Sequence, residues 1–360
     1  MEIIHENEYL YRMNKEAEPY LELHRQEKYV SNAENFIRGK NKDFSGKIHI
    51  QYYLAKNPRG VIVISHGFTE GSPKYDEMIY YFLKAGYHVY MPEHMGHGLS
   101  YRLTADPSLV HVDIWKRYVR DFLKVCREIK GTHSDLPLIL FAHSMGGAIG
   151  GISASWEPGL FQKIILSSPM IRPLTGKVPW PLVVLIAHFE CFFGKAQKYV
   201  AGQKLYDGGE SFETCAGTSE SRFERYDKIR RAHKELQTCA ASYGWLLAAI
   251  KMSWYLRIWG WKKIKVPVLF FQAENDDFVS VRALKRFAGK VKQQGSSSCK
   301  YIYMPGTKHE IYCSDDSSME KYLKQIFQVS HYSLRNPEDP SITAMHLQLL
   351  QNLNSPYHPM

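Results

Sequence analysis

A serine at the end of an apolar run constrains the fold more than any other feature of the chain. Residues 137–147 read Pro-Leu-Ile-Leu-Phe-Ala-His-Ser-Met-Gly-Gly, which is typical of a buried strand that turns sharply into a helix. Such a turn holds the serine in a strained backbone conformation and needs small residues two positions before and after it. Ala142 and Gly146 meet that demand, although Ala142 replaces the glycine of the usual Gly-x-Ser-x-Gly pattern. We therefore expect either a nucleophile at Ser144 or an ordinary strand-to-helix turn.

Two later segments supply the groups that a serine nucleophile requires. A serine hydroxyl needs a general base, and the base needs a group that fixes its tautomer. Residues 268–272 predict a strand, and the loop after it carries Asp276 and Asp277. Residues 300–310 predict a short strand, a Pro-Gly turn and then His309. His309 is therefore the candidate base, with Asp276 or Asp277 as the acid.

The oxyanion formed on an attacked carbonyl requires donors that are fixed in advance, usually two backbone amides. An apolar strand expected at Val61–Ser65 is followed by His66-Gly67, a turn that can aim the amide of Phe68 at the site. The amide of Met145, directly after the serine, is the second expected donor. His66 itself is interpreted as a turn residue that hydrogen-bonds the loop.

Short apolar runs alternate with helix-like stretches along the chain. This βαβα order predicts an α/β fold with a mostly parallel sheet that is covered on both faces. The 360 residues are 44% hydrophobic, which favours one large domain with an insertion over two independent domains. The expected strands are Ile48–Ala55, Val61–Ser65, Tyr87–Met91, Leu138–Ala142, Ile164–Ser168, Val268–Gln272 and Tyr301–Met304.

With these segments in place, residues 44–328 resemble the α/β-hydrolase superfamily, and within it the group of monoacylglycerol lipases and bacterial lysophospholipase L2. The motifs that carry the resemblance, besides the serine turn, are His66-Gly67 with Glu70 and Tyr75, Leu83-x-x-Gly86-Tyr-x-Val89, Glu93-His-Met-Gly-His-Gly-Leu-Ser100, His111-Val-Asp-Ile-Trp-x-x-Tyr-Val-x-Asp121, Ser221-Arg-x-x-Arg-Tyr226 and Ser242-Tyr-Gly-Trp245.

The resemblance implies an α/β-hydrolase fold with an inserted helical cap and a catalytic triad that needs no cofactor and no metal. By position, the family's nucleophile falls on Ser144, its base on His309 and its acid on Asp276, which the register of the preceding strand favours over Asp277.

The segment Glu93–Ser100 departs from the family. Glu93 and Met95 stand where the family usually has Asp and Arg, which puts any salt bridge at that loop in doubt. His94 and His97 are interpreted as loop residues, because their spacing matches no metal-ligand pattern.

The resemblance divides the chain into four parts. Residues 1–43 form an expected N-terminal helical extension with a helix within Glu16–Val30. Residues 44–169 and 263–330 form the hydrolase core, and residues 170–262 form the cap, or lid. Residues 331–360 form a C-terminal tail with a short helix expected at Ile342–Leu353.

Two apolar stretches in the expected cap are suited to contact with a lipid. Residues 182–193 form an apolar run that is interrupted by His188 and Glu190 and is too short to span a bilayer as a helix, which takes about 20 residues. They are expected to line an acyl-chain pocket or to touch a membrane surface. Residues 243–261 are rich in aromatic side chains and are expected to form a wall of the substrate pocket or to pack within the cap. The candidate substrate-binding residues are His143 in the expected core and Tyr243 and Trp245 in the expected cap.

The net charge of +10 favours anionic partners in general. No known nucleic-acid module is evident, so no nucleic acid is expected as a partner. Peripheral contact with an anionic membrane is expected instead, with the basic cluster at 221–231 either aiding it or forming a solvated helix face. The six cysteines lack paired spacing, and the N-terminus lacks a signal-peptide pattern. We therefore expect a cytoplasmic protein; the sequence predicts no oligomeric state.

The resemblance implies a serine hydrolase that cleaves carboxylic esters of lipids, with lysophospholipids or monoacylglycerols as substrates. The same triad would also serve a small-acyl esterase, an amidase or a peptidase, because a fold does not determine a substrate. A non-catalytic binding protein of the same fold is the remaining alternative.

Overall fold

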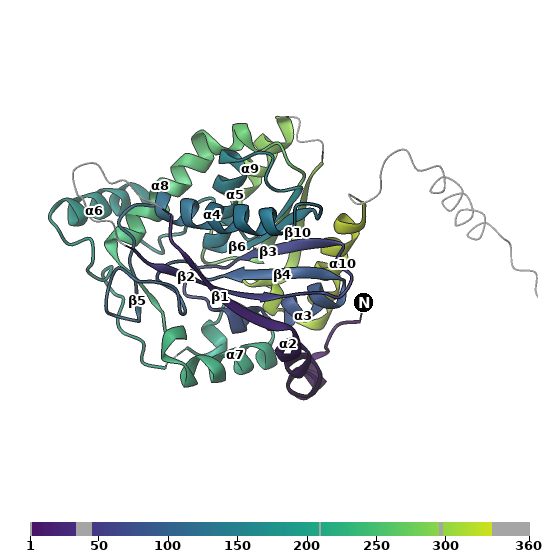
Figure 1. Cartoon of the computed structure of the whole chain (residues 1–360). Helices are drawn as coiled ribbons and strands as arrows, with labels where there is room; N and C mark the ends of the chain where they lie inside the picture. Colours follow the sequence, from purple (N-terminus) through teal and green to yellow (C-terminus); the bar gives the residue numbers. More distant parts are fainter. Residues whose placement is uncertain (1, 34–44, 209, 295–297, 333–360) are drawn as a thin grey trace, which may run out of the picture. The chain divides into compact units, whose positions relative to one another are not determined.

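A computed structural model describes residues 2–33, 45–208, 210–294 and 298–332 of the chain (Figure 1). The chain divides into two compact units, Met1–Glu320 and Lys321–Met360, and all the strands lie in the first. The strands are β1 (Arg25–Ser31), β2 (Lys47–Tyr53), β3 (Gly60–Ser65), β4 (Tyr87–Pro92), β5 (Leu109–Val110), β6 (Leu138–His143), β7 (Lys163–Ser167), β8 (Ala240–Ala241), β9 (Val268–Asn275) and β10 (Cys299–Lys308). The α-helices are α1 (Tyr9–Arg12), α2 (Glu18–His24), α3 (Asp76–Lys84), α4 (Lys116–Thr132), α5 (Ser144–Trp156), α6 (Trp180–Phe192), α7 (Glu220–Ala232), α8 (Tyr243–Ile258), α9 (Val281–Gln293) and α10 (Asp316–Tyr332).

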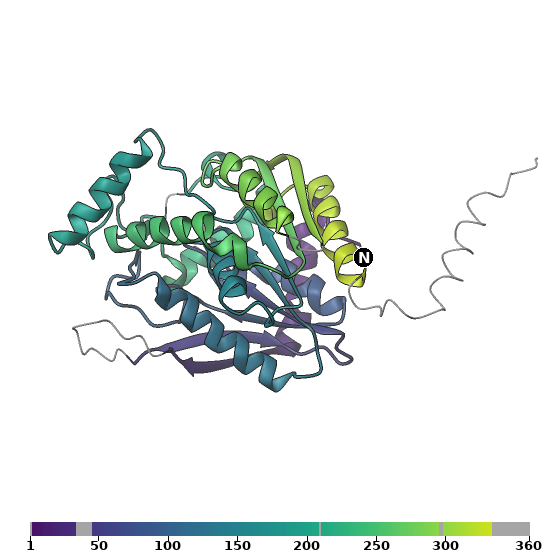
Figure 2. The ribbon, with the colours of Figure 1, turned by 90° about the horizontal axis from the view of Figure 1, so that it is seen from above.

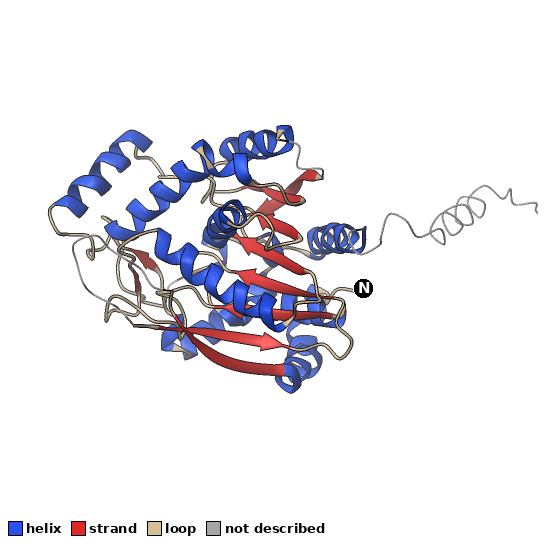
Figure 3. Cartoon of the chain, turned by 45° about the horizontal axis from the view of Figure 1, so that its top comes forward, coloured by secondary structure: helices blue, strands red, loops and turns tan. Residues whose placement is uncertain are grey.

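An eight-stranded sheet with the order β1-β2-β4-β3-β6-β7-β9-β10 forms the centre of the first unit (Figure 3). β2 runs antiparallel to both of its neighbours, and the pairs from β4 to β10 are parallel. The inner strands β3, β6 and β7 are buried along their whole length. Such strands need apolar residues on both faces, which explains why apolar runs without alternation predicted them. The mostly parallel sheet is therefore as expected.

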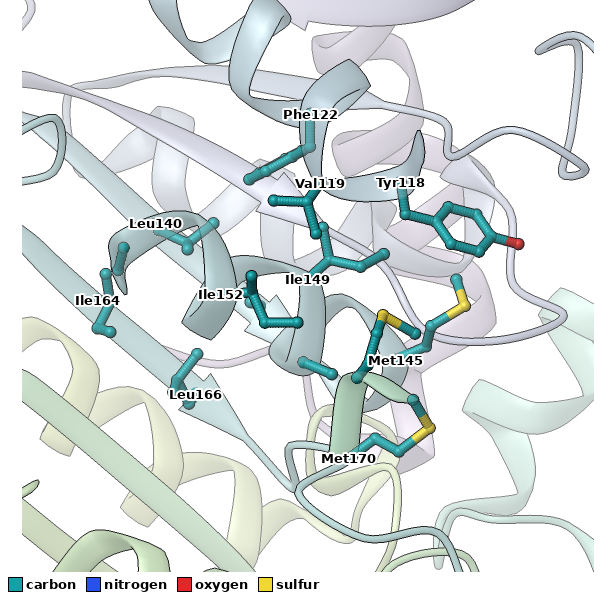
Figure 4. Close-up of a cluster of buried hydrophobic side chains, with 14 of the residues drawn as sticks. Tyr118, Val119, Phe122, Leu140, Met145, Ile149, Ile152, Ile164, Leu166 and Met170 are labelled. Carbon is teal, nitrogen blue, oxygen red and sulfur yellow. The ribbon is translucent and has the colours of Figure 1, made fainter. Parts of the chain in front are cut away.

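Helices cover both faces of this sheet, with α4, α5, α8 and α9 on one side and α3 on the other (Figure 1). Between α4, α5 and the strands lies an apolar cluster that includes Val119, Phe122, Leu140, Ile149 and Leu166 (Figure 4). Full burial of each such side chain contributes about 1.5–3 kcal/mol. This cluster makes a rigid base for the turn at the start of α5.

The N-terminal segment differs from the expected helical extension. A helix lies within Glu16–Val30 as predicted, namely α2, but it ends at His24, and Arg25–Ser31 forms β1, the edge strand of the main sheet. β1 pairs antiparallel with β2. Its charged, half-exposed residues resemble an exposed helix in sequence, but charges are also how edge strands avoid pairing with other chains. The helix expected at Ile342–Leu353 lies outside the described residues.

The segment between β7 and β9, where a cap was expected at 170–262, consists of parts with different surroundings. α8 packs against α5, and its Trp245, Ala249 and Met252 belong to the main apolar cluster. α6 lies beside α8 with most of its side chains exposed (Figure 2). α8 therefore packs into the main apolar cluster through α5, whereas α6 does not. Across the described ranges, no helix is both long and apolar enough to cross a membrane.

Candidate active site

The turn from β6 into α5 holds Ser144 at the carboxyl edge of the sheet. Ser144 has a φ of 50°, a conformation that is strained for a residue with a side chain. The turn is tight because α5 passes close to the end of β3. A Cβ atom on Gly146 would collide with the backbone carbonyl of Ser65, so only glycine fits there. Ala142, two residues before the serine, is completely buried and fits without a glycine.

The loop after β10 brings His309 to this serine. Its Nε2 lies 2.8 Å from Ser144 Oγ, and its Nδ1 lies 2.9 Å from Asp276 Oδ2. All three side chains are largely buried. The structure thus brings together the three residues at which the nucleophile, base and acid were expected.

The loop after β9 distinguishes the two candidate acids. Asp276 Oδ1 accepts hydrogen bonds from the amides of Phe278 (3.0 Å) and Val279 (2.9 Å), while Oδ2 faces His309. Burial alone would raise the pKa of Asp276, but His309 and the two amides lower it below its ordinary value, so the carboxylate stays ionised. Asp277 is exposed to solvent. The geometry therefore favours Asp276 as the partner of His309.

The side chains of the two residues expected to supply oxyanion donors both contact Trp245. The Phe68 ring is 4.0 Å from the Trp245 ring, and Trp245 Nε1 donates to Met145 Sδ at 3.4 Å. Met145 is the second residue of α5, so its amide precedes the hydrogen-bond ladder of the helix. Within the described ranges, no hydrogen-bond acceptor contacts the amide of Phe68. Both amides are therefore available to a substrate oxygen.

Hydrogen bonds to its neighbours hold the Phe68 amide in place. The preceding amide, of Gly67, donates to the carboxylate of Glu70, and the following amide, of Thr69, donates to His97 Nε2 at 3.1 Å. Thr69 itself has a φ of 61°, in the left-handed region. His66 hydrogen-bonds the loop, as expected, because its Nε2 accepts from the amide of His94 at 2.8 Å.

His94 and His97 form structural hydrogen bonds on the neighbouring loop. Both are almost completely buried, and burial lowers their pKa values well below that of an exposed histidine, with a further contribution from the charge of His66. His94 Nε2 lies 2.8 Å from Ser65 Oγ. No group of His, Cys, Asp and Glu suited to a metal ion occurs among the residues that the structure describes.

Glu93 is held by a set of hydrogen bonds to the residues around it. Its carboxylate accepts from Ser72 Oγ at 3.0 Å and from the Leu99 amide at 2.8 Å, and it lies 2.9 Å from His49 Nδ1. Burial would raise its pKa, but these partners lower it below the ordinary value. Glu93 therefore fastens the 93–100 loop without the arginine that usually stands at Met95.

Sequence reasoning missed the role of Glu70 beneath the site. Its two carboxylate oxygens accept from the hydroxyls of Tyr75 (2.6 Å) and Tyr312 (2.7 Å), and one of them also accepts from the Gly67 amide. Burial would raise its pKa, but these donors and nearby cationic groups lower it to about 2. Since Tyr312 follows His309 by three residues, Glu70 joins the oxyanion turn to the loop of the base.

The three residues expected to bind substrate occupy different places. His143 is completely buried behind the triad, with its ring 4.7 Å from that of His309. Burial lowers the pKa of His143 to about 3, so the ring is neutral. Its position corrects the expected substrate contact to a supporting role. Trp245 touches both oxyanion candidates, whereas Tyr243 accepts from the amide of Ala201 at 3.3 Å, within the 168–267 segment.

Comparisons with known proteins match the chain to a family of hydrolases and to lipid hydrolases. The family described as serine aminopeptidase, S33, matches residues 56–316. The monoglyceride lipase homolog of monkeypox virus is 35% identical over 269 residues, covering 75% of this chain and 88% of the viral protein. The probable lysophospholipase L2 of Haemophilus influenzae is 25% identical over 272 residues, covering 74% of this chain and 82% of the bacterial protein.

Two solved structures have a similar fold. A soluble variant of the monoglyceride lipase from Saccharomyces cerevisiae has a TM-score of 0.67 at 16% identity and covers 86% of this chain and 96% of the yeast chain. A thermostable carboxyl esterase from Bacillus coagulans has a TM-score of 0.67 at 18% identity and covers 86% and 99% of the two chains. At these identities the likeness concerns the fold alone.

Proposed function

This chain belongs to the serine aminopeptidase S33 family, and from that premise we propose that it is a serine hydrolase that cleaves carboxylic esters of lipids through an acyl-enzyme intermediate. The observation that carries the proposal is the continuous hydrogen-bonded chain from Ser144 Oγ through His309 to Asp276. A binding protein would have no use for a strained serine aligned with a base and an ionised acid.

The proposed reaction has two halves. Ser144 Oγ attacks the ester carbonyl while His309 Nε2 takes its proton, and the amides of Phe68 and Met145 stabilise the oxyanion. Asp276 holds the imidazole in the required tautomer and stabilises its protonated form. His309 then gives the proton to the leaving alcohol. A water molecule, activated by the same histidine, attacks the acyl-enzyme and releases the fatty acid.

Lipid esters are the proposed substrate class, with lysophospholipids and monoacylglycerols as the first candidates. The relatives named lysophospholipase and monoglyceride lipase support this choice. So does α6, where Leu185, Phe189 and Phe192 are 64%, 55% and 84% exposed. An exposed apolar surface of this kind suits contact with lipid. We also propose that α6 gives the protein peripheral contact with a membrane surface.

A peptidase or amidase is the second candidate, because the matching family is described as serine aminopeptidase. The same triad can attack an amide carbonyl. The two candidates differ in the bond that is cleaved, so a substrate panel separates them.

The test compares p-nitrophenyl esters of increasing acyl length, monoolein, lysophosphatidylcholine and aminoacyl amides. We expect the highest kcat/KM with long-chain esters, because burial of the acyl chain contributes about 0.8 kcal/mol per methylene. A preference for aminoacyl amides would support the peptidase, and a preference for acetate would support a small-acyl esterase. Ser144→Ala is the control, and it should lower turnover by several orders of magnitude with whichever substrate is preferred.

Two matched variants test the acid. Asp276→Asn should remove most of the activity, because the amide would leave His309 in the wrong tautomer. Asp277→Asn, one residue away and exposed, should have little effect. The reverse ranking would contradict the assignment.

A further inference from the structure

A basic cleft of about 460 Å³ lies where the start of α6, the end of α8 and one face of α9 meet. Trp180 and Trp254 contribute aromatic surface to it. Ser280, the residue that caps the N-terminus of α9, also lines it. In the described part of the chain no carboxylate lines the cleft, and five cationic side chains do: Arg172, Arg257, Arg282, Arg286 and Lys290.

The charges in this cleft are not neutralised by the protein. Among the described residues, no acidic group forms an ion pair with any of the five cations. The Nε of Arg172 is buried and has no hydrogen-bond acceptor in the described part of the chain. Partial burial lowers the pKa of Arg257, and the nearby charges of Arg172 and Arg286 lower it further. Cations held this close together without a counter-charge favour the binding of an anion.

The side chains suit an anion with several acceptor oxygens, such as a phosphate group, better than a chloride ion. Guanidinium groups present parallel donors that match the oxygens of a phosphate, and several of them converge on this cleft. The guanidinium of Arg172 lies 4.9 Å from the centre of the Trp180 ring, a stacking contact that restricts its orientation. We propose that this cleft is a binding site for a phosphate ester, either the head group of a lipid or a free phosphate compound.

The cleft shares a backbone segment with the triad. The amide of Ser280 donates to the carbonyl of Arg172 at 2.9 Å, and the amide of Leu174 donates to the carbonyl of Phe278 at 2.8 Å. The Phe278 ring lies 5.0 Å from that of His309. Residues 276–280 therefore carry the acid Asp276, contact the base His309 through Phe278, and line the cleft through Ser280. A phosphate in the cleft would lie against the same segment that positions the acid.

The first test measures the binding of inorganic phosphate by isothermal titration calorimetry, at constant ionic strength set with sodium chloride. The cleft variant is Arg257→Gln with Arg286→Gln, and the control is Lys285→Gln with Lys292→Gln, which removes the same charge from α9 residues outside the cleft. The cleft variant should bind phosphate about tenfold or more weakly, and the control should bind like the wild type. No binding by the wild type, or equal loss in both variants, would overturn the site. Circular dichroism and activity on p-nitrophenyl butyrate check that both variants are folded.

The second test identifies the source of the phosphate, and it alone rests on the lipid-ester hydrolysis proposed above. It compares kcat/KM for lysophosphatidic acid with that for monoolein, which lacks the phosphate. We expect the cleft variant to lose about tenfold on the phosphate-bearing lipid and little on monoolein. An unchanged ratio, with phosphate binding lost, would overturn the lipid head group as the source and assign the cleft to a free phosphate compound. If neither lipid is hydrolysed by the wild type, the proposed function fails while the calorimetry still decides the site.

Discussion

Two helices between β7 and β9 reverse the usual relation between polarity and burial. α6 is apolar except for His188 and Glu190, yet among its residues only Ala187 is buried. α7 is dominated by charged residues, yet it buries Arg222, Arg225 and Arg230. The difference lies in their partners. Acidic groups from distant parts of the chain meet the arginines of α7. Most apolar side chains of α6, which lies beside α8 (Figure 2), stay exposed.

The partners of α7 come mainly from the first turn of α3. Arg222 forms two hydrogen bonds of 2.9 Å with the carboxylate of Glu77, and Arg225 donates to Asp76 at 2.8 Å. These arginines belong to the basic cluster at 221–231 that was expected either to aid contact with an anionic membrane or to form a solvated helix face. The internal ion pairs show that these two arginines do not face solvent, whereas Lys228 and Arg231 of the same cluster are exposed. The comparison teaches that a charged segment need not face solvent when another element supplies the opposite charges.

The largest effect is expected from breaking the buried pair of α7. Arg222→Ala should lower the free energy of unfolding by about 3–5 kcal/mol, because it leaves Glu77 buried without its partner. Urea denaturation followed by circular dichroism measures the change. The matched control is Arg231→Ala in the same helix, whose exposed pair with Asp227 should contribute little. Equal stability of the two variants would remove the contrast between buried and exposed charges on α7.

A smaller effect, on activity, is expected from α8, the third helix of the segment. Trp245→Leu removes the ring that touches Phe68 and Met145 and should lower kcat about 10- to 100-fold through misplacement of the oxyanion donors. The loss should be equal for an acetate ester and a long-chain ester. Trp259→Leu, at an exposed position after the same helix, is the control. A loss confined to the long-chain ester would show instead that Trp245 lines the acyl pocket.

The smallest effect is expected from α6. Leu185→Ser with Phe192→Ser should leave the free energy of unfolding nearly unchanged, since both side chains are already exposed. The same pair should weaken binding to phospholipid vesicles in a sedimentation assay, because each apolar side chain buried in the interface contributes about 1.5–3 kcal/mol at most. Unchanged vesicle binding together with a large loss of stability would mean that α6 is a packing helix and not a lipid contact.

Much of the fold could be predicted from the order in which the motifs follow one another along the sequence. The α/β-hydrolase fold and its family, expected from short motifs, are confirmed by the family match and the similar solved structures. Local patterns also predicted the strands of the inner sheet, because a strand buried on both faces is an apolar run. The edge strand β1 lacked that signal, since its residues are charged and half exposed.

The supporting contacts of the site could not be predicted, because they join residues far apart in the chain. Glu70 and Tyr312 are separated by 242 positions, and Arg222 and Glu77 by 145. No local pattern records such pairs. The acid is a different case, because the register of the preceding strand favoured Asp276 over Asp277 and the path of the loop turns Asp276 toward His309.

The central claim is that Ser144 is the nucleophile, and covalent labelling tests it most directly. The wild-type protein is treated with a fluorophosphonate, which reacts with activated serines, and the modified peptide is located by mass spectrometry. We predict a single adduct on Ser144, with no labelling of Ser144→Ala, because only this serine is hydrogen-bonded to His309 among the described residues. An adduct on another residue, or labelling at full strength in Ser144→Ala, would contradict the account.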